Sequence, residues 1–152
     1  MKKNIGAPSL IHRMAHIAVV RSLYNREITD KLLESCLKEL TAGGLRADSI
    51  KVVAVPGAFE LPYACQKMIL LKKFDAVVAL GAVIKGETPH FDYIALNTAR
   101  GIMDVSLKFG IPVIFGVLTT NSLSQAKARI KGGKRGDKGK EAARAALKLL
   151  TI

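Results

Sequence analysis

The chain has 152 residues, of which 49% are hydrophobic and 24% are charged. This length and composition are typical of one globular domain, and no apolar run is long enough for a membrane-spanning helix. Lysine and arginine outnumber aspartate and glutamate by 24 to 12, which gives a formal net charge of +12. Such an excess favours anionic partners, namely nucleic acid, phosphorylated small molecules or acidic membranes, and it does not choose among them.

Short apolar segments alternate with amphipathic segments along the chain. The apolar segments predict four strands, over residues 15–20, 50–55, 75–80 and 112–120. Helical spacing predicts a first helix that Asn25 caps and that ends at Gly43. The further helices are predicted to run from the turn containing Pro62 to about Lys72, and over about 91–109, 122–130 and 140–150.

Strands that alternate with helices predict a parallel sheet with helices on both faces. Continuous apolar strands agree, because parallel strands are buried on both sides. The predicted fold is therefore a three-layer α/β/α sandwich with a four-stranded parallel sheet, of the flavodoxin-like kind. Residues 1–14 are predicted to form an N-terminal arm, and residues 15–152 a single domain.

The location of the chain is predicted from its start and its cysteines. The start is basic but lacks an apolar stretch, so we expect no signal peptide. Cys36 and Cys65 fall on apolar faces without metal-ligand spacing, which predicts buried free thiols. Free thiols are typical of the reducing cytoplasm, where we place the protein.

Reactive side chains follow each predicted strand. In open parallel sheets, ligands bind beyond the carboxyl ends of the strands. Tyr24 and Asn25 follow the first strand, residues 56–60 the second, residues 85–90 the third and residues 119–121 the fourth. Two aromatic rings, two carboxylates and a histidine are therefore predicted to meet at one edge of the sheet.

Each of these side chains also has an ordinary structural explanation. His90 is suited to proton transfer near neutral pH, yet a histidine at a helix start is more often simply exposed. Glu60 and Glu87 lie in first helical turns, where carboxylates offset the helix dipole. Tyr24 and Phe59 are also explained as core or lid aromatics. The chain has no glycine-rich nucleotide-binding motif and no metal-ligand spacing, so no such site is predicted.

The segment "KGGKRGDKGK", residues 131–140, concentrates the positive charge. Its explanations are a solvated loop, a phosphate-binding loop or an RNA contact. RNA is the weakest of the three, because an aromatic content of 5% leaves few stacking platforms. Arg129 lies just before this segment, and a guanidinium can bind a phosphate through two parallel hydrogen bonds.

Three motifs together resemble the lumazine synthase family. They are "VPGAFELP" (55–62), "LGAVIKGETPHFDY" (80–93) and "PVIFGVLTT" (112–120), and their mutual spacing also agrees. Tyr24-Asn25 and "DKGKEAA" (137–143) fit the same pattern. The resemblance implies an enzyme of riboflavin biosynthesis, a transferase that condenses 5-amino-6-(D-ribitylamino)uracil with 3,4-dihydroxy-2-butanone 4-phosphate. The product is 6,7-dimethyl-8-ribityllumazine, phosphate is released, and neither metal nor organic cofactor is needed.

The resemblance also implies roles for individual residues. His90 is the acid–base residue. The pyrimidine and its ribityl chain are bound by Tyr24, Ala58, Phe59, Glu60, Ala82, Val83, Ile84 and Phe115. The phosphate-bearing substrate is bound by Gly86, Glu87, Thr88 and Arg129. Three positions depart from the usual pattern. Tyr24 stands where the family usually has Phe or Trp, Ala82 where it usually has Thr, and Ala128 where many members have an acid.

The resemblance implies a homo-oligomer built from pentamers, with Phe115 and Arg129 contributed by the neighbouring subunit. Some members assemble twelve pentamers into a hollow shell, and a longer loop after Arg129, as here, accompanies pentamers alone in some members. Partners are predicted to be small-molecule substrates, without a membrane or nucleic acid. Two alternatives remain: a non-catalytic relative that binds lumazine or flavin, and a basic shell or RNA-binding protein.

Overall fold

The structure is a computed structural model, and it describes residues 9–152. Four parallel strands form one sheet in the order β2-β1-β3-β4. The strands are β1 (Ile17–Ser22), β2 (Ile50–Val55), β3 (Ala76–Ile84) and β4 (Val113–Thr120). The helices are α1 (Leu10–Met14), α2 (Arg26–Ala42), α3 (Leu61–Leu70), α4 (His90–Phe109), α5 (Leu123–Lys127) and α6 (Lys138–Leu149), with short 3₁₀ turns η1 (Ala47–Ser49) and η2 (Ala58–Glu60).

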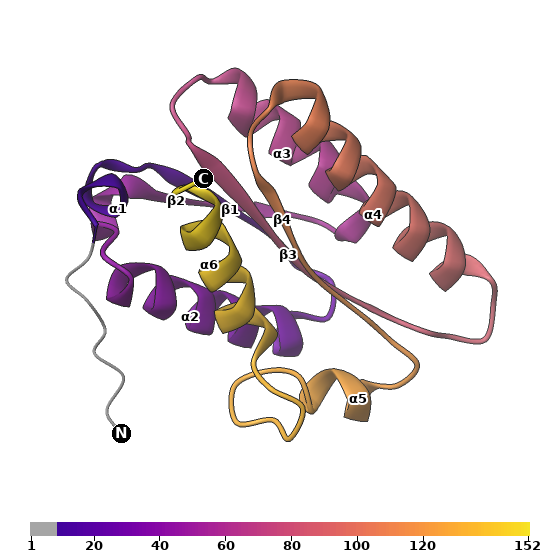
Figure 1. The fold of residues 1–152 in the computed structure, drawn as a ribbon. Coiled ribbons are helices and arrows are strands. Elements are labelled where there is room, and N and C mark those ends of the chain that lie inside the picture. Colours follow the sequence, from indigo (N-terminus) through magenta and orange to yellow (C-terminus); the bar gives the residue numbers. More distant parts are fainter. Residues whose placement is uncertain (1–8) are drawn as a thin grey trace.

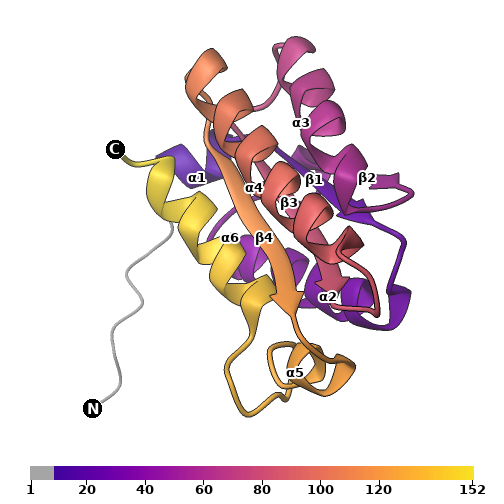
Figure 2. The ribbon, with the colours of Figure 1, turned by 90° about the vertical axis from the view of Figure 1, so that its right-hand side faces the viewer.

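Helices cover both faces of the sheet (Figures 1 and 2). Alternate residues of each strand point to opposite faces, so Ile17 and Val19 pack with α2 and α6, whereas Ala18 and Val20 pack with α3 and α4. Both sides of β1 and β3 are therefore buried, which explains their unbroken apolar sequences. The predicted three-layer α/β/α sandwich with a flavodoxin-like parallel sheet is confirmed.

Two element boundaries differ from the prediction by more than two residues. Strand β3 runs to Ile84 and not to residue 80, because residues 81–84 continue to pair with β4 as far as Thr120. The helix predicted over 122–130 is shorter, since α5 ends at Lys127. The chain then turns back on itself, where the backbone N–H of Arg135 donates to the carbonyl of Ala128 (2.7 Å) and that of Lys138 to the carbonyl of Arg129 (2.9 Å).

Local chemistry accounts for most of the helix ends. Helix α2 ends at Gly43, as predicted. The hydroxyl of Ser122 accepts a hydrogen bond from the backbone N–H of Gln125, which caps α5. Gly110 ends α4 in the left-handed conformation (φ 64°), as its lack of a side chain allows. Asn25 precedes α2, but its side chain makes no capping bond, so the predicted side-chain cap is wrong.

The described part of the predicted arm packs against the domain. One ring nitrogen of His12 lies 3.0 Å from the carbonyl oxygen of Gly43, and the other lies 2.9 Å from that of Leu147. Helix α1 is thereby attached to the ends of both α2 and α6. Residues 1–8 of the predicted arm lie outside the described residues.

The thiols of Cys36 and Cys65 are buried and free, as predicted. Burial raises the pKa of each to about 12, because an apolar environment disfavours the thiolate. Neither cysteine is therefore a nucleophile at neutral pH.

Candidate active site

A cavity of about 600 Å³, here called the cleft cavity, lies at the carboxyl ends of β1, β2 and β3. Strand β1 leads into α2 on one face of the sheet, whereas β3 leads into α4 on the other face. Adjacent strands whose connections diverge in this way leave a crevice between them. The cavity is lined by Tyr24 and Asn25, residues 56–60, residues 82–84, Gly86, Thr88, His90, Phe91 and Ile94.

Two aromatic rings at the cleft cavity are open to solvent. The exposed fraction is 74% for Tyr24 and 57% for Phe59, which excludes the explanation that either is a core aromatic. The backbone next to Tyr24 is nevertheless held in place, because the N–H groups of Leu23 and Tyr24 donate to the carbonyls of Val55 and Pro56 (2.8 and 2.9 Å). The result is an open aromatic face on an anchored chain.

The carboxylate of Glu60 lines the same cavity. One of its oxygens accepts a hydrogen bond from the backbone N–H of Gly57 (3.1 Å), so the side chain has a defined position. Glu60 is thus an acid in a first helical turn, as its structural explanation predicts, but this role occupies only part of the carboxylate. A carboxylate has acceptor capacity for several donors, and the remaining capacity is available to a ligand hydroxyl.

His90 is the first residue of α4, and it borders the cleft cavity together with Thr88 and Gly86. Its backbone N–H donates to the hydroxyl of Thr88 (3.4 Å), and a Cβ added at Gly86 would meet no atom within 4 Å. The start of a helix offers free N–H groups and the positive end of the helix dipole. An imidazole and a helix end with free N–H groups therefore lie together.

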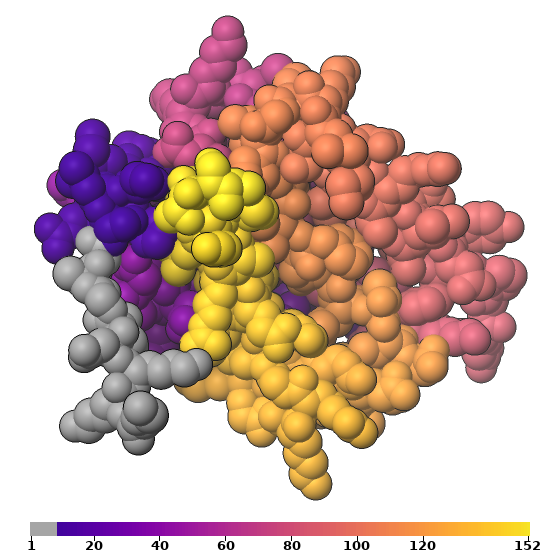
Figure 3. Space-filling model, in the orientation of Figure 1, coloured from indigo at the N-terminus to yellow at the C-terminus, as the bar shows by residue number. Residues whose placement is uncertain are grey.

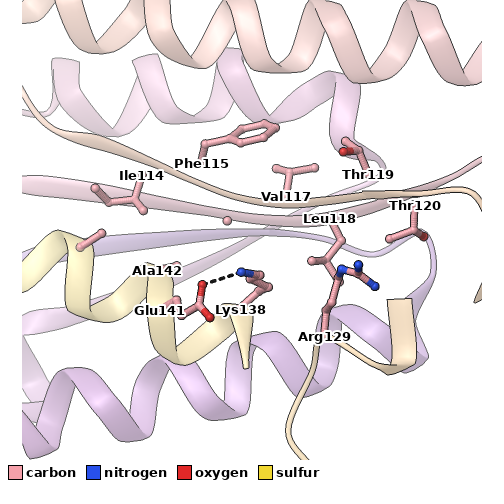
Figure 4. Close-up of a pocket in the computed structure, with 12 residues that line it drawn as sticks. Ile114, Phe115, Val117, Leu118, Thr119, Thr120, Arg129, Lys138, Glu141 and Ala142 are labelled. Carbon is pink, nitrogen blue, oxygen red and sulfur yellow. Dashed lines mark hydrogen bonds and ion pairs between the residues drawn. The ribbon is translucent and has the colours of Figure 1, made fainter. Parts of the chain in front are cut away.

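A second cavity, here called the edge cavity, measures about 400 Å³ and follows the outer strand β4. Within residues 9–152, no strand pairs with the outer side of β4, which reaches the surface beside α6 in Figures 2 and 3. Figure 4 shows that Phe115 lies on one side of the strand, whereas Arg129, Lys138 and Glu141 lie on the other. The edge cavity thus joins an aromatic ring that is 44% exposed to a group of charged side chains.

The two cations of the edge cavity differ in their partners. Lys138 forms an ion pair with Glu141, one turn further along α6 (2.7 Å). Arg129 pairs with no carboxylate of residues 9–152, and its guanidinium donates only to the backbone carbonyl of Gln125 (2.8 Å). Arg129 therefore keeps most of its donors free for an anion.

The close packing of α6 against α2 positions Lys138. A Cβ at the next residue, Gly139, would collide with the backbone carbonyl of Leu32 in α2. The first turn of α6 can therefore lie directly against the α2 backbone only because residue 139 has no side chain.

The family was identified by comparison with known proteins. The family model of 6,7-dimethyl-8-ribityllumazine synthase matches residues 14–152. The chain is 46% identical over 138 residues to the 6,7-dimethyl-8-ribityllumazine synthase of Protochlamydia amoebophila, an alignment that covers 91% of this chain and 80% of the relative. This chain belongs to the lumazine synthase family.

Two further relatives in the lumazine synthase family agree. The protein of the same name from Campylobacter jejuni is 46% identical over 136 residues, covering 90% of this chain and 88% of the relative. That from Gemmatimonas aurantiaca is 48% identical over 136 residues, covering 90% of this chain and 82% of the relative. The resemblance found in the motifs thus extends along the whole domain.

The structure divides the predicted lumazine synthase residues between the two cavities. The cleft cavity brings together Tyr24, Ala58, Phe59, Glu60, Ala82, Val83, Ile84, Gly86, Thr88 and His90. Phe115 and Arg129 line the edge cavity instead. Glu87 lies in the loop between β3 and α4 but lines neither cavity. One chain therefore does not assemble all the predicted residues at one place.

Sequence reasoning missed Lys138 and Glu141 as residues of a cavity. The only signal was the motif "DKGKEAA", which was matched to the lumazine synthase family without a role for either residue. The sequence analysis also placed Asn25 at this edge of the sheet without giving it a role, and Asn25 lines the cleft cavity. Among residues 9–152 there is no cluster of three His, Cys, Asp or Glu side chains that could hold a metal ion.

Proposed function

We propose that this chain condenses 5-amino-6-(D-ribitylamino)uracil with 3,4-dihydroxy-2-butanone 4-phosphate to give 6,7-dimethyl-8-ribityllumazine, inorganic phosphate and water, a step of riboflavin biosynthesis. One observation carries the proposal: His90, the anchored carboxylate of Glu60 and two open aromatic rings border one cavity. The relatives named above support the same proposal, since they are 6,7-dimethyl-8-ribityllumazine synthases.

The pyrimidine substrate fits the chemistry of the cleft cavity. Its flat ring stacks on Tyr24, and its polar edge meets the backbone of residues 82–84. Its ribityl hydroxyls donate to Glu60, next to Ala58 and Phe59. The cavity of about 600 Å³ is of the size that holds such a molecule.

His90 moves protons during the reaction. Imine formation, loss of phosphate and ring closure each transfer protons to or from the substrates, and an imidazole does so efficiently near neutral pH. Its position at the border of the cleft cavity supports this role. We propose that the reaction needs no metal or organic cofactor, because its steps are amine–carbonyl condensations that release water, proton transfers and the departure of a stable anion.

The phosphate is bound from two sides. Gly86, Glu87 and Thr88 lie just before α4, whose first N–H groups and helix dipole favour an anion. Arg129 of a neighbouring copy approaches from the other side, and Lys138 lies in the same edge cavity. Arg129 is suited to the task because it has no carboxylate partner among residues 9–152.

The division of residues between two cavities supports a site shared by neighbouring copies. An exposed apolar stripe on α4 supplies a surface for the contact: Tyr93, Leu96, Met103 and Leu107 are each between 59% and 75% exposed. A stripe of this kind is typical of protein–protein contacts. We propose pentamers of this chain, in which the edge cavity of one copy completes the cleft cavity of the next.

We also infer a cytoplasmic location, from the buried and free thiols of Cys36 and Cys65. Within residues 9–152, no helix combines the length and the apolar character that crossing a membrane requires. The basic segment 131–140 partly serves the fold, since Lys131 pairs with Glu34 of α2 (2.7 Å). We therefore assign the excess charge to phosphorylated substrates and not to RNA.

The decisive experiment follows lumazine fluorescence after the purified chain is mixed with both substrates. Product formation well above the uncatalysed rate, without added metal or cofactor, supports the proposal. A background rate from folded protein overturns it in favour of a binding relative, which titration with riboflavin would then detect.

A mixing experiment tests whether the site is shared. His90→Ala and Arg129→Ala are each expected to be impaired, and coexpression of the two variants in one oligomer places an intact His90 opposite an intact Arg129 at some contacts. Recovery of activity in the mixed oligomer supports the shared site. Activity no higher than that of the separate variants means that both residues act within one chain.

A further inference from the structure

We propose that Asn25 is a positioning residue, whose side-chain amide fixes the Tyr24 ring at a set distance from the backbone edge of residues 82–84. The inference rests on the proposed function, since these two walls are the ones that hold the pyrimidine. Asn25 itself is assigned no chemical step.

The backbone of Asn25 is in an unusual conformation. Its φ and ψ angles are 58° and 47°, in the left-handed region. Within residues 9–152, the only other non-glycine residue with positive φ is Lys72, in the turn between α3 and β3. Asparagine tolerates this conformation better than most residues, but it still carries a cost that other contacts must offset.

The side chain of Asn25 makes the contact that offsets this cost. Its Nδ2 donates to the carbonyl oxygen of Ala82 in β3 (2.9 Å). A carbonyl only accepts hydrogen bonds, so the nitrogen of the amide must face Ala82 and the oxygen must face away. The left-handed backbone turns the side chain back toward the sheet, whereas an ordinary cap would turn it toward the helix.

The Ala82 carbonyl lies beyond the end of β1. The last pair between β1 and β3 joins Arg21 to Leu80, and the chain after β1 then bonds only toward β2, through the N–H groups of Leu23 and Tyr24. The amide of Asn25 therefore takes the place of a strand N–H on the side of β3. Without it, the segment that carries Tyr24 is attached on one side alone.

Three substitutions separate the hydrogen bond from the backbone conformation. Asn25→Gly accepts the left-handed backbone and removes the donor. Asn25→Asp also tolerates this backbone and places an oxygen against the Ala82 carbonyl. Asn25→Ala loses the donor and also disfavours the backbone. Lys72→Gly is the matched control, because it relieves the other left-handed residue far from both cavities.

The expected result is a change confined to one substrate. For Asn25→Gly, the KM of the pyrimidine substrate rises about five- to tenfold, which corresponds to one net hydrogen bond. Its kcat and the KM of the phosphorylated substrate change by less than about twofold. A purely structural role would instead lower the active fraction and leave both KM values unchanged. Impairment of Asn25→Ala alone, with Asn25→Gly behaving like the parent, would overturn the proposal.

A second readout does not depend on catalysis. The chain contains no tryptophan, so Tyr24→Trp creates a single tryptophan at the proposed wall, and its fluorescence can be excited at a wavelength that the remaining tyrosines do not absorb. Fluorescence anisotropy decay is compared between Tyr24→Trp alone and the same chain with Asn25→Gly, with folding checked by circular dichroism. Faster local motion of the indole in the double variant supports the proposal, and equal decays contradict it. If the parent chain makes no lumazine, the proposed function fails, while this comparison still decides the role of Asn25.

Discussion

The cleft cavity and the edge cavity differ in what holds their walls. The walls of the cleft cavity are strand ends and the residues that directly follow them, and they carry aromatic rings, a carboxylate and an imidazole. The walls of the edge cavity are an outer strand, the turn that carries Arg129, and the start of α6, and they carry two cations. The difference indicates that the two cavities suit different ligands. The cleft cavity suits a flat ring that bears a polyol chain, and the edge cavity suits a phosphate.

Removing the imidazole tests the cleft cavity most severely. His90→Ala is expected to lower turnover by about 10²–10⁴-fold, because proton transfers lose their carrier. Steady-state kinetics by lumazine fluorescence measures the loss, and the KM values should change far less. Turnover close to that of the parent would remove His90 from the mechanism.

Separating the subunits of the proposed oligomer tests whether activity requires the edge cavity of one subunit beside the cleft cavity of the next. Leu107→Asp places a charge in the exposed apolar stripe of α4 and is expected to break the oligomer, which sedimentation velocity detects. Activity should fall with the loss of assembly, because each cleft cavity then lacks its edge cavity. Lys108→Glu, at the neighbouring position off the stripe, is the matched control. A monomeric and fully active Leu107→Asp would disprove the shared site.

Removing the Arg129 guanidinium from the edge cavity tests which substrate that cavity binds. Arg129→Ala is expected to raise the KM of the phosphorylated substrate about ten- to a hundredfold, the value of one or two charge-assisted hydrogen bonds. The KM of the pyrimidine should stay near the parent value. Arg135→Ala is the control, since this exposed arginine lies on the same turn but lines neither cavity. Equal effects of the two substitutions would point to the general charge of the loop.

The smallest effect on turnover is expected at an ion pair outside both cavities. The hydrogen bond from buried Arg21 holds the pKa of the Asp30 carboxyl below its usual value of 3.8. A carboxyl whose pKa is lower in the folded chain stabilises it above the unfolded pKa, and this stability is lost as the pH falls through the folded pKa.

Asp30→Asn removes this pH-dependent contribution. The variant should be less stable than the parent at neutral pH, and the difference should shrink as the pH falls below about 4. Urea unfolding at several pH values measures it, with turnover of the folded variant unchanged. A stability difference that is constant with pH would show that the pair does not contribute in this way.

Sequence patterns predicted one cavity better than the other for a physical reason. Residues directly after parallel strands must lie at one sheet edge, so Tyr24, Glu60 and His90 were placed together by strand order alone. The position of Lys138 depends instead on long-range backbone hydrogen bonds of the turn after α5, such as that from Lys138 to Arg129. A run of lysines and glycines does not reveal which lysine such bonds will place at a cavity.

Predictions from local sequence were also wrong where a hydrogen bond to a residue far along the chain was stronger than the local preference. Asparagine before a helix predicts a capping side chain, yet Asn25 bonds to Ala82, 57 residues further along. The end of β3 was predicted too early, at residue 80, because pairing with β4 extends the strand through residues 81–84. Short-range preferences are small, and a tertiary hydrogen bond can outweigh them.

Gly139 has a consequence for how freely this sequence can vary. Any other residue there would push α6 away from Leu32, and Lys138 would move with it. A saturation screen should therefore record residue 139 as intolerant, although it offers no chemical group to either substrate. A functional screen of this chain would then rank a residue without a side chain beside the charged residues that we propose to bind the substrate.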